Sequence, residues 1–337
     1  MSALLPLVLA SVVAGCAPRD EAPASDIPRV RVGMVFDAGG KDDKSFNTAC
    51  WTGAVRARKE FDIELKDVEP GDPSAVEAAI QTLADAGFDL IIGVGGANAP
   101  HLEDAAKQHP DLKFAVVDDA GGVLQQPNGA SLVFEEHEGA FLVGMIAAAK
   151  SHTGVIGFVG GMDIPLIRRF ELGYEAGAKH INPDVVVLQN YAGSTAGAWT
   201  NPNRGKELAR SQYDRNADVI FAAAGTTGLG VFDAAEQENK YVIGVDANQN
   251  YLKPGHVLTS MLKRSDVAVY ETIKSVVNDG FAGGRKVYSL RNDGIGYAVD
   301  DYNRDILPSG IIEQVEEAKR RIVSGELVVP DYLKENT

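Results

Sequence analysis

The sequence predicts an α/β protein made of two similar lobes, each with a parallel sheet covered by helices on both faces. Three observations support this fold class. Strand-like apolar runs alternate with helical patterns, the second half of the chain repeats features of the first half in the same order, and the length of 337 residues suits two domains. Domains usually contain roughly 100 to 200 residues, so one or four domains would fit this length less well.

The alternation is clearest in the apolar runs of strand length. We expect strands at residues 31–36, 89–94, 114–117, 155–159, 185–188, 219–224, 241–245 and 257–261. Helical patterns lie between them, for example at 74–86 and 203–216, and a C-terminal helix at 311–324 is expected to pack on the second lobe. This alternation is typical of parallel sheets with helices on both faces.

The internal repeat consists of three matches at nearly constant offset. Residues 113–120 parallel residues 240–247 at an offset of 127, and residues 89–96 parallel residues 218–225 at an offset of 129. Upstream, Phe46 with Gly53 parallels Phe170 with Gly177 at an offset of 124. Either the chain is an internal duplication, or two Rossmann-like halves share these features through their architecture alone. Both interpretations place the carboxyl ends of the strands at one crevice, where such sheets bind ligands.

The N-terminal stretch has the features of an export signal. Residues 1–17 carry no charge, and Val13-Ala14-Gly15-Cys16 resembles a bacterial lipobox, in which the chain is cut before the cysteine and lipid joins the thiol. We expect a signal peptide at 1–15, a lipidated Cys16 with a tether at 16–29, and an exported lipoprotein anchored to the bacterial cell membrane or facing the periplasm. An apolar tail without consequence is the alternative. Cys50 would then remain as a lone thiol, expected to be buried on a helix.

The charge balance excludes one class of partner. The 47 Asp and Glu residues against 32 Lys and Arg residues give a formal net charge of -15. Affinity for nucleic acid depends mainly on clustered basic side chains, so no nucleic-acid partner is expected. The apolar runs are shorter than the roughly 18 residues that a membrane-spanning helix requires.

The densest candidate motif directly follows the first expected strand, at residues 36–47. Its glycines allow a sharp turn, and Asp43 or Ser45 could cap the helix that follows. Asp37, Phe46 and Asn47 would then lie near the strand end, where a flat apolar ring beside an amide suits a planar heterocycle. The alternative is a capped strand-to-helix turn with Phe46 in the core.

Acidic side chains and glycines follow other expected strands. Asp118, Asp119 and Asp246 could accept hydrogen bonds from ligand hydroxyl or N–H groups, and the repeat pairs Asp119 with Asp246. The Gly-rich turns at 93–96 and 225–230 match neither a dinucleotide nor a nucleoside-triphosphate motif, and the histidines show no metal-binding spacing. No cofactor and no metal are therefore expected. Hydrolysis of a glycosidic bond by acids in the crevice remains the enzymatic alternative.

These motifs together resemble the basic membrane protein family of ABC-transporter substrate-binding lipoproteins, from about residue 31 to residue 297. The matching stretches are 37–47, 157–165 with Arg168-Arg169-Phe170, 224–230, 244–246 and 259–264. The resemblance implies a periplasmic-binding-protein type I fold, with two Rossmann-like lobes joined by crossover strands around a ligand cleft. It implies lobes at 30–149 plus 266–298 and at 150–265 plus 299–337.

The resemblance also implies a ligand and residue roles. Nucleoside-binding members hold a purine nucleoside of the inosine, guanosine and adenosine class between two aromatic rings, matched here by Phe46 and Trp199. The second ring is typically a Phe after Tyr-x-Gly, whereas here residues 194–198 separate that motif from Trp199. The other implied roles are base-edge contacts for Asn47 and Asp118, ribose contacts for Asp37, Asp246 and Lys263, and a backbone contact for Gly225. Here the family match favours Asp118 over Asp119.

The implied function is capture of the nucleoside by a monomer that closes like a hinged trap. Its implied partners are the permease and ATPase subunits of an ABC importer and, through the lipid anchor, the membrane. Two alternatives remain open: the same fold binding a sugar, riboflavin or a nucleobase-type signal, and an enzyme that cleaves nucleosides.

Overall fold

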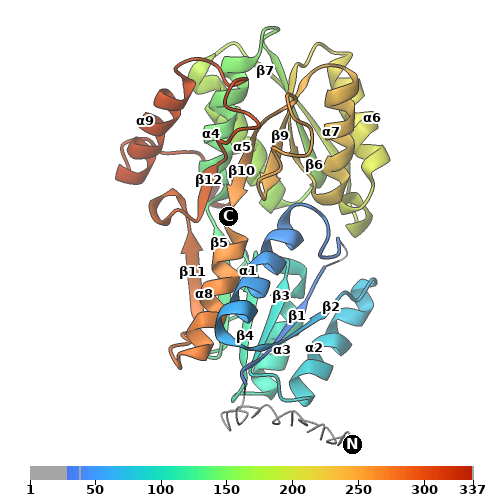
Figure 1. Ribbon diagram of the computed structural model, residues 1–337, viewed down its shortest axis with the longest axis vertical. Helices are drawn as coiled ribbons and strands as arrows, with labels where there is room; N and C mark the ends of the chain where they lie inside the picture. The colour runs from blue at the N-terminus through green and yellow to red at the C-terminus, as the bar shows by residue number, and fades with distance from the viewer. Residues whose placement is uncertain (1–28, 38, 336–337) are drawn as a thin grey trace, which may run out of the picture.

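The computed structural model describes residues 29–37 and 39–335, which form two lobes stacked along the long axis of the molecule (Figure 1). The predicted signal peptide at 1–15, Cys16 and the predicted tether up to residue 28 lie outside the described residues. Each lobe contains one six-stranded sheet. All strand pairs are parallel except that between β10 and β12. The predicted α/β class with two parallel-rich sheets is therefore confirmed.

The sheet of the first lobe has the strand order β11-β5-β4-β3-β1-β2. Its strands are β1 (Arg31–Val35), β2 (Glu64–Val68), β3 (Leu90–Val94), β4 (Lys113–Val117), β5 (Gly129–Phe134) and β11 (Gly284–Tyr288). The helices of this lobe are α1 (Phe46–Phe61), α2 (Val76–Asp85), α3 (Ala99–Gln108) and α8 (Ser265–Val277), with short 3-10 turns η1 (Pro73–Ala75) and η2 (Gly96–Asn98). The orange segment in Figure 1 shows the chain returning from the second lobe to supply α8 and β11.

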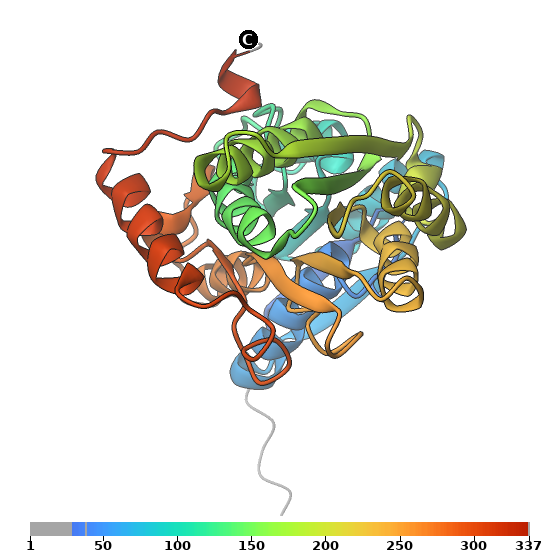
Figure 2. The same ribbon diagram turned by 90° about the horizontal axis from the view of Figure 1, so that it is seen from above.

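The sheet of the second lobe has the order β12-β10-β9-β8-β6-β7. Its strands are β6 (Val155–Met162), β7 (Val186–Gly193), β8 (Val219–Ala223), β9 (Tyr241–Asp246), β10 (Val257–Lys263) and β12 (Ile295–Tyr297). Its helices are α4 (Glu136–Lys150), α5 (Pro165–Ile181), α6 (Pro202–Tyr213), α7 (Gly228–Gln237), α9 (Ile311–Ser324) and α10 (Tyr332–Glu335). The 3-10 turns are η3 (Ala196–Trp199), η4 (Gly225–Thr227) and η5 (Leu290–Asn292). Helix α9 has its predicted bounds and packs on α4 along one side of the lobe (Figure 2).

The repeat in the sequence corresponds to equivalent halves of the structure. Strands β4-β3-β1-β2 of the first sheet and β9-β8-β6-β7 of the second have the same relative order. The repeated stretches 89–96 and 218–225 cover β3 and β8, and 113–120 and 240–247 cover β4 and β9. Phe46 begins α1, and Phe170 lies in α5, the helix that follows the equivalent strand.

The chain passes between the lobes at three crossovers. They lie between β5 and α4, between β10 and α8, and between β11 and β12. Helix α4 packs most extensively on α5, and β12 pairs with β10, so both elements join the second lobe rather than the first. We therefore propose lobes at 29–135 plus 265–288 and at 136–264 plus 295–335, in place of the boundaries expected from the sequence.

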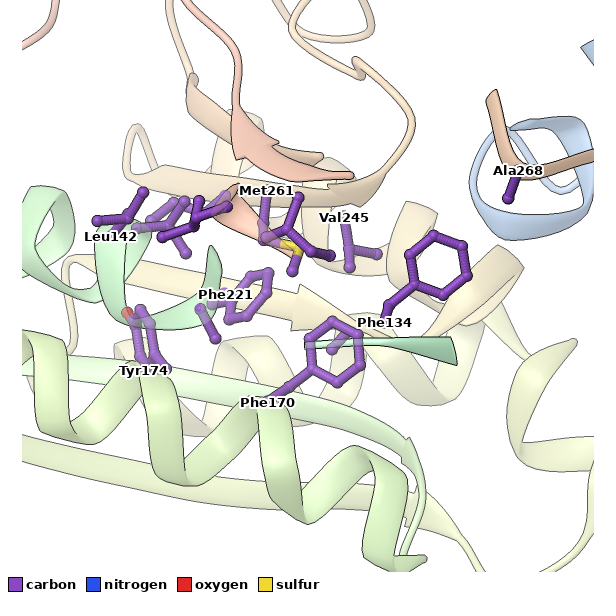
Figure 3. Close-up of a cluster of buried hydrophobic side chains, with 14 of the residues drawn as sticks. Phe134, Leu142, Phe170, Tyr174, Phe221, Val245, Met261 and Ala268 are labelled. Carbon is purple, nitrogen blue, oxygen red and sulfur yellow. The ribbon is translucent and has the colours of Figure 1, made fainter. Parts of the chain in front are cut away.

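The hydrophobic core extends through both lobes. One cluster includes Met34 and Ile92 on the inner face of the first sheet and Phe158 and Phe221 in the second, while separate clusters cover the outer face of each sheet. Figure 3 shows Phe170, Tyr174 and Phe221 within the large cluster, below Met261 and Val245. The Phe221 ring centroid lies 5.3 Å from that of Tyr174 and 6.3 Å from that of Phe170. Phe170, which also lines the cavity between the lobes, is thus packed against the core of the second lobe.

A glycine permits the close packing of α4 on α5. A Cβ atom added to Gly177 would lie 1.9 Å from the carbonyl oxygen of Phe141, so no larger residue fits without moving one helix. Cys50 is buried in α1 as expected, and burial raises its pKa, which makes the thiol unreactive.

Candidate functional site

A cavity of about 350 Å³ lies between the two lobes, at the carboxyl ends of their strands. This volume falls in the range of about 300–1,000 Å³ that is typical of small-molecule sites. The structure brings together in its lining every ligand-contacting residue expected from the sequence: Asp37, Phe46, Asn47, Asp118, Trp199, Gly225, Asp246 and Lys263. Asp37, Phe46, Asn47 and Asp118 come from the first lobe and the others from the second, so the cavity depends on both lobes.

Local chain geometry places most of these residues at a strand end or just beyond one. Asp118 directly follows β4, Asp37 and Gly225 lie just beyond β1 and β8, and Phe46 and Asn47 begin α1. Asp246 and Lys263 end β9 and β10, and Trp199 ends η3. Because parallel strands present their carboxyl ends at one edge of a sheet, residues far apart in the sequence converge here.

Asn47 is held rigidly at the cavity wall. Its amide Nδ2 donates to Oδ1 of Asp37 at 2.7 Å and to the carbonyl oxygen of Gly40 at 3.0 Å. The side-chain oxygen of Asn47 is buried and has no hydrogen-bond partner. Burial raises the pKa of Asp37, while hydrogen bonds from Asn47 and from the backbone of Gly39 partly offset the shift.

Asp118 and Lys263 form a buried ion pair across the lobes. The Lys263 Nζ lies 2.6 Å from Oδ2 of Asp118 and 3.2 Å from Oε1 of Glu136. Burial would lower the pKa of Lys263, but the charges of Asp118 and Glu136 outweigh it, so the pKa is raised and the ammonium stays charged. Burial raises the pKa of Asp118 to about 7, against the opposing effect of Lys263. The ammonium also lies 4.9 Å from the ring centroid of Phe46.

Asp118, and not Asp119, is the structural counterpart of Asp246. Asp118 and Asp246 share a left-handed backbone, with φ of 73° and 65°, at equivalent strand ends. Asp119 points into the following loop, where it accepts hydrogen bonds from the backbone of Val123 and Leu124 and from the hydroxyl of Ser131. The repeat alignment that paired Asp119 with Asp246 is therefore wrong by one residue at this position.

The loop before α1 closes the cavity against the second lobe. The hydroxyl of Ser45 donates to Oδ2 of Asp246 at 2.6 Å, and Nε2 of Gln249 donates to the carbonyl oxygen of Lys44 at 2.9 Å. Asp43 caps α1, because its carboxylate accepts from the backbone of Ser45, Asn47 and Thr48. Of the two expected cap residues, Asp43 therefore fills that role, while Ser45 contacts the other lobe.

Apolar side chains form much of the cavity wall. Phe46 lines it from the first lobe and Trp199 from the second. Gly161 leaves room for the indole, since a Cβ atom there would lie 2.2 Å from the Trp199 ring. Further lining residues near the start of α5 had no predicted role, although they lie in or beside the stretch 157–170 that resembles the family: Met162, Ile164, Leu166, Ile167 and Phe170.

A buried chain of charged side chains leads away from the cavity and was not predicted from the sequence. It consists of Lys263, Glu136, Arg169 and Asp331. Glu136 is 1% exposed and bridges Lys263 and Arg169, whose Nη1 lies 2.7 Å from Oε2 of Glu136. Arg169 in turn binds both carboxylate oxygens of Asp331, at 2.7 and 2.8 Å, and also pairs with Glu135. The only sequence signal was the pair Glu135-Glu136 directly after an apolar strand.

Among the described residues, one group has carboxylates and a histidine close enough to hold a cation: Glu135, His137 and Asp331. The guanidinium of Arg169 already pairs with both carboxylates. A metal ion would have to displace that buried charge, so these residues do not fit a metal site.

The family follows from comparison with known proteins. A family model described as ABC transporter substrate-binding protein PnrA-like, named Bmp, matches residues 30–332. The chain belongs to the Bmp family. Members of this family are substrate-binding proteins of ABC transporters, so the chain is a solute-binding protein that works with a permease, and its task is binding rather than catalysis.

Two relatives match nearly the whole length of this Bmp protein. It is 34% identical over 334 residues to basic membrane protein A of Borreliella burgdorferi, covering 97% of this chain and 95% of the relative. It is 31% identical over 347 residues to an uncharacterized lipoprotein of Pyrococcus abyssi, covering 95% of this chain and 85% of the relative.

A solved structure extends the comparison to the fold. An ABC-transporter solute-binding protein of Aeropyrum pernix superposes with a TM-score of 0.78 at 32% identity, covering 89% of this chain and 93% of that protein. The periplasmic-binding-protein type I fold implied by the resemblance is thus confirmed for this Bmp protein. Within the described part of the chain, no helix combines the length and apolar character needed to cross a membrane.

Proposed function

We propose that this protein captures purine nucleosides and delivers them to an ABC importer. The observation that carries the proposal is the pairing of Phe46 and Trp199, which line one cavity from opposite lobes. A purine base offers two flat faces, and each face can stack on one of these rings. Carboxylates at the strand ends, Asp37 and Asp246, then suit the hydroxyl groups of a ribose.

The expected energies are sufficient for tight binding. Stacking on an aromatic ring contributes about 1–3 kcal/mol for each base face. Hydrogen bonds to charged groups contribute about 1.5–3 kcal/mol each. Two stacked faces and several such bonds exceed the about 8–12 kcal/mol that micromolar to nanomolar affinity requires. The surplus offsets the loss of freedom of the ligand and the ordering of the lobes.

Closure of the lobes is the proposed mechanism. A nucleoside reaches residues of both lobes only when they are shut, so binding shifts the population toward the closed form. The hydrogen bonds from Ser45 to Asp246 and from Gln249 to Lys44 join the two lobes, so they would also stabilise a closed form. The permease would recognise this closed surface, and the ATPase subunits would supply the energy for import.

Isothermal titration with inosine, guanosine and adenosine tests the proposal directly. We expect at least one of these nucleosides to bind with a Kd in the micromolar range or below. AMP should bind far more weakly, because its phosphate would enter a cavity lined by Asp37, Asp43, Asp118 and Asp246 against one lysine. Absence of binding by every nucleoside, or AMP binding as tightly as adenosine, would contradict the proposal. Mass spectrometry of ligand retained through native purification would then identify a sugar, riboflavin or nucleobase instead.

We also propose that Cys16 carries a lipid that holds the protein at the membrane. The lipobox-like residues before Cys16 and the lipoprotein relative in Pyrococcus abyssi support this proposal. In cells that process lipoproteins, Cys16→Ser is expected to move the protein from the membrane fraction to the soluble fraction. Cys50→Ser is the matched control, because that thiol is buried in α1. Equal membrane association of the Cys16 variant and the unaltered protein would rule out the anchor.

A further inference from the structure

The three crossovers between the lobes are bonded to one another. The backbone N–H of Glu135, between β5 and α4, donates to the carbonyl oxygen of Tyr288 at 2.8 Å. The backbone N–H of Arg264, between β10 and α8, donates to the carbonyl oxygen of Gly294 at 2.9 Å. Tyr288 ends β11 and Gly294 precedes β12, so both belong to the third crossover. A restraint on one crossover therefore limits how the lobes rotate about all three.

Arg169 of α5 supplies such a restraint on the first crossover. Its guanidinium donates to the carbonyl oxygen of Phe134, the last residue of β5, and pairs with the carboxylates of Glu135 and Glu136. Phe134 belongs to the first lobe, whereas Arg169 belongs to the second. The guanidinium is a rigid planar fork, so its bonds along the crossover fix the direction in which the chain leaves β5.

The C-terminal segment at residues 329–335, here called the strap, holds Arg169 from the other side. The chain runs from α9 across to α10, which packs on α5 (Figure 2, red). Val329 and Asp331 of the strap are 6% and 5% exposed. The Asp331 carboxylate accepts from Nε of Arg169 at 2.7 Å and from Nη2 at 2.8 Å. The strap is thus anchored in the core and bonded to the residue that grips the crossover.

Glu136 connects this contact to the ion pair between the lobes. Its Oε2 lies 2.7 Å from Nη1 of Arg169, and its Oε1 lies 3.2 Å from Nζ of Lys263. Lys263 in turn pairs with Asp118 of the first lobe. Of the described residues that line the cavity, none is Glu136, Arg169 or Asp331. The loss of Asp331 would therefore loosen the crossover and the ion pair without removing a contact to the solute.

We propose that the strap sets the angle between the lobes through Asp331 and Arg169, and thereby sets the affinity of the cavity. With the strap bonded, Phe46 and Trp199 line one cavity from opposite lobes. With the strap weakened, the lobes spend more time apart. The apparent affinity then falls by the same factor as the population of the form that can bind. This role goes beyond the proposed function, because it does not depend on which solute binds.

Asp331→Asn tests the strap without changing its shape. A carboxamide can accept from one guanidinium nitrogen but turns its NH₂ group toward the other, which releases part of the hold on Arg169. Small-angle X-ray scattering of the full chain, without added solute, should give a larger radius of gyration than the unaltered protein has. Titration calorimetry should show Kd values for inosine, guanosine and adenosine that all rise by one common factor, of at least about five.

Two further variants separate the strap from a general loss of stability. Glu135→Gln weakens the same guanidinium contact from the crossover while Asp331 stays in place, so the radius of gyration and the Kd values should rise here too. This variant carries the test if Asp331→Asn does not fold. Glu326→Gln is the matched control, because it removes a carboxylate that pairs with Arg321 at the surface, just before the strap. It should change neither quantity.

The possible outcomes are distinct. If Asp331→Asn and Glu135→Gln lower the unfolding temperature but leave the radius of gyration and the Kd values unchanged, the strap does not control the lobes. Kd values that change by different factors for different nucleosides would indicate a disturbed cavity wall and would also contradict the proposal. If no nucleoside binds the unaltered protein, the proposed function fails, and the scattering measurement alone decides whether the strap holds the lobes.

Discussion

Replacing Arg169 with methionine is expected to lower the free energy of unfolding by about 3–5 kcal/mol. The guanidinium is 3% exposed, and it pairs with Glu136 and Asp331, which are 1% and 5% exposed. Methionine would fill most of the space but would leave buried carboxylates without their cation. Urea unfolding followed by circular dichroism measures the change.

The adjacent arginine is a matched control for that loss. Arg168 is partly exposed, and it pairs with the exposed Asp163 and with the buried Glu171, which also accepts a hydrogen bond from the hydroxyl of Tyr191. Because solvent reaches Arg168 and Glu171 keeps a partner, Arg168→Met should cost clearly less than Arg169→Met. Similar losses for the two variants would contradict a structural role for the buried chain of charges.

The pH dependence of the Arg169 effect gives a second readout. Burial alone would raise the pKa of Asp331, but the hydrogen bonds and charge of Arg169 outweigh it and lower the pKa to about 2. A carboxyl whose folded pKa is depressed stabilises the fold above its ordinary pKa, and this contribution disappears as the pH falls through the folded value. The difference in stability between the unaltered protein and Arg169→Met should therefore shrink as the pH falls from 3.8 through about 2.

Trp199→Ala is expected to weaken nucleoside binding by about 1–3 kcal/mol, or roughly 5- to 150-fold in Kd. Trp199 supplies the aromatic face of the second lobe, and alanine would leave the base stacked on Phe46 alone. Trp199→Phe retains an aromatic face and should lose less. Titration calorimetry measures each affinity, and thermal unfolding separates a loss of contact from a loss of fold.

Trp51 is the control, because the chain contains two tryptophans and Trp51 does not line the cavity. Its ring lies against Phe36 in the first lobe, with centroids 6.2 Å apart. Trp51→Phe should leave the nucleoside affinity unchanged, and all remaining indole fluorescence then comes from Trp199. Quenching of the Trp51→Phe fluorescence by a nucleoside would support stacking on Trp199. If this fluorescence stays unchanged, and if Trp199→Ala binds the nucleoside as tightly as the unaltered protein, the ligand lies elsewhere.

Most of the strands that were predicted have apolar residues because both faces of the sheet are covered, although the edge strand β7 was predicted too. Strands β3, β4, β8 and β9 are of this kind, and all their expected positions overlap the observed strands. The edge strands β2 and β11 were missed, because their sequences ELKDV and GRKVY contain charged residues and have no apolar run. The short strand β12 and the buried strand β5 were missed as well, since β5 begins with the small residues Gly-Ala-Ser. A strand at the edge of a sheet is partly exposed to solvent and needs few apolar residues, so its amino-acid composition does not distinguish it from a loop.

The site was predictable where chain geometry is local, and less so where distant segments meet. Residues just beyond a strand end, such as Asp37 and Asp118, are placed at the cavity by the topology alone. The contact of Arg169 with Asp331 joins residues 162 positions apart, and its contact with Glu136 joins residues 33 positions apart. No spacing in the sequence signals such pairs, because the crossovers determine which segments meet.

The left-handed backbone at Asp118 and Asp246 restricts how this binding site can diversify. Among residues other than glycine, asparagine and aspartate adopt a positive φ most readily, because their short polar side chains tolerate it. Glutamate, glutamine or a branched residue at either position would strain the strand end before it met any ligand. Mutational drift is thereby confined largely to exchanges between acid, amide and glycine. New ligand preferences in this scaffold would then arise through single changes that swap a carboxylate for a carboxamide.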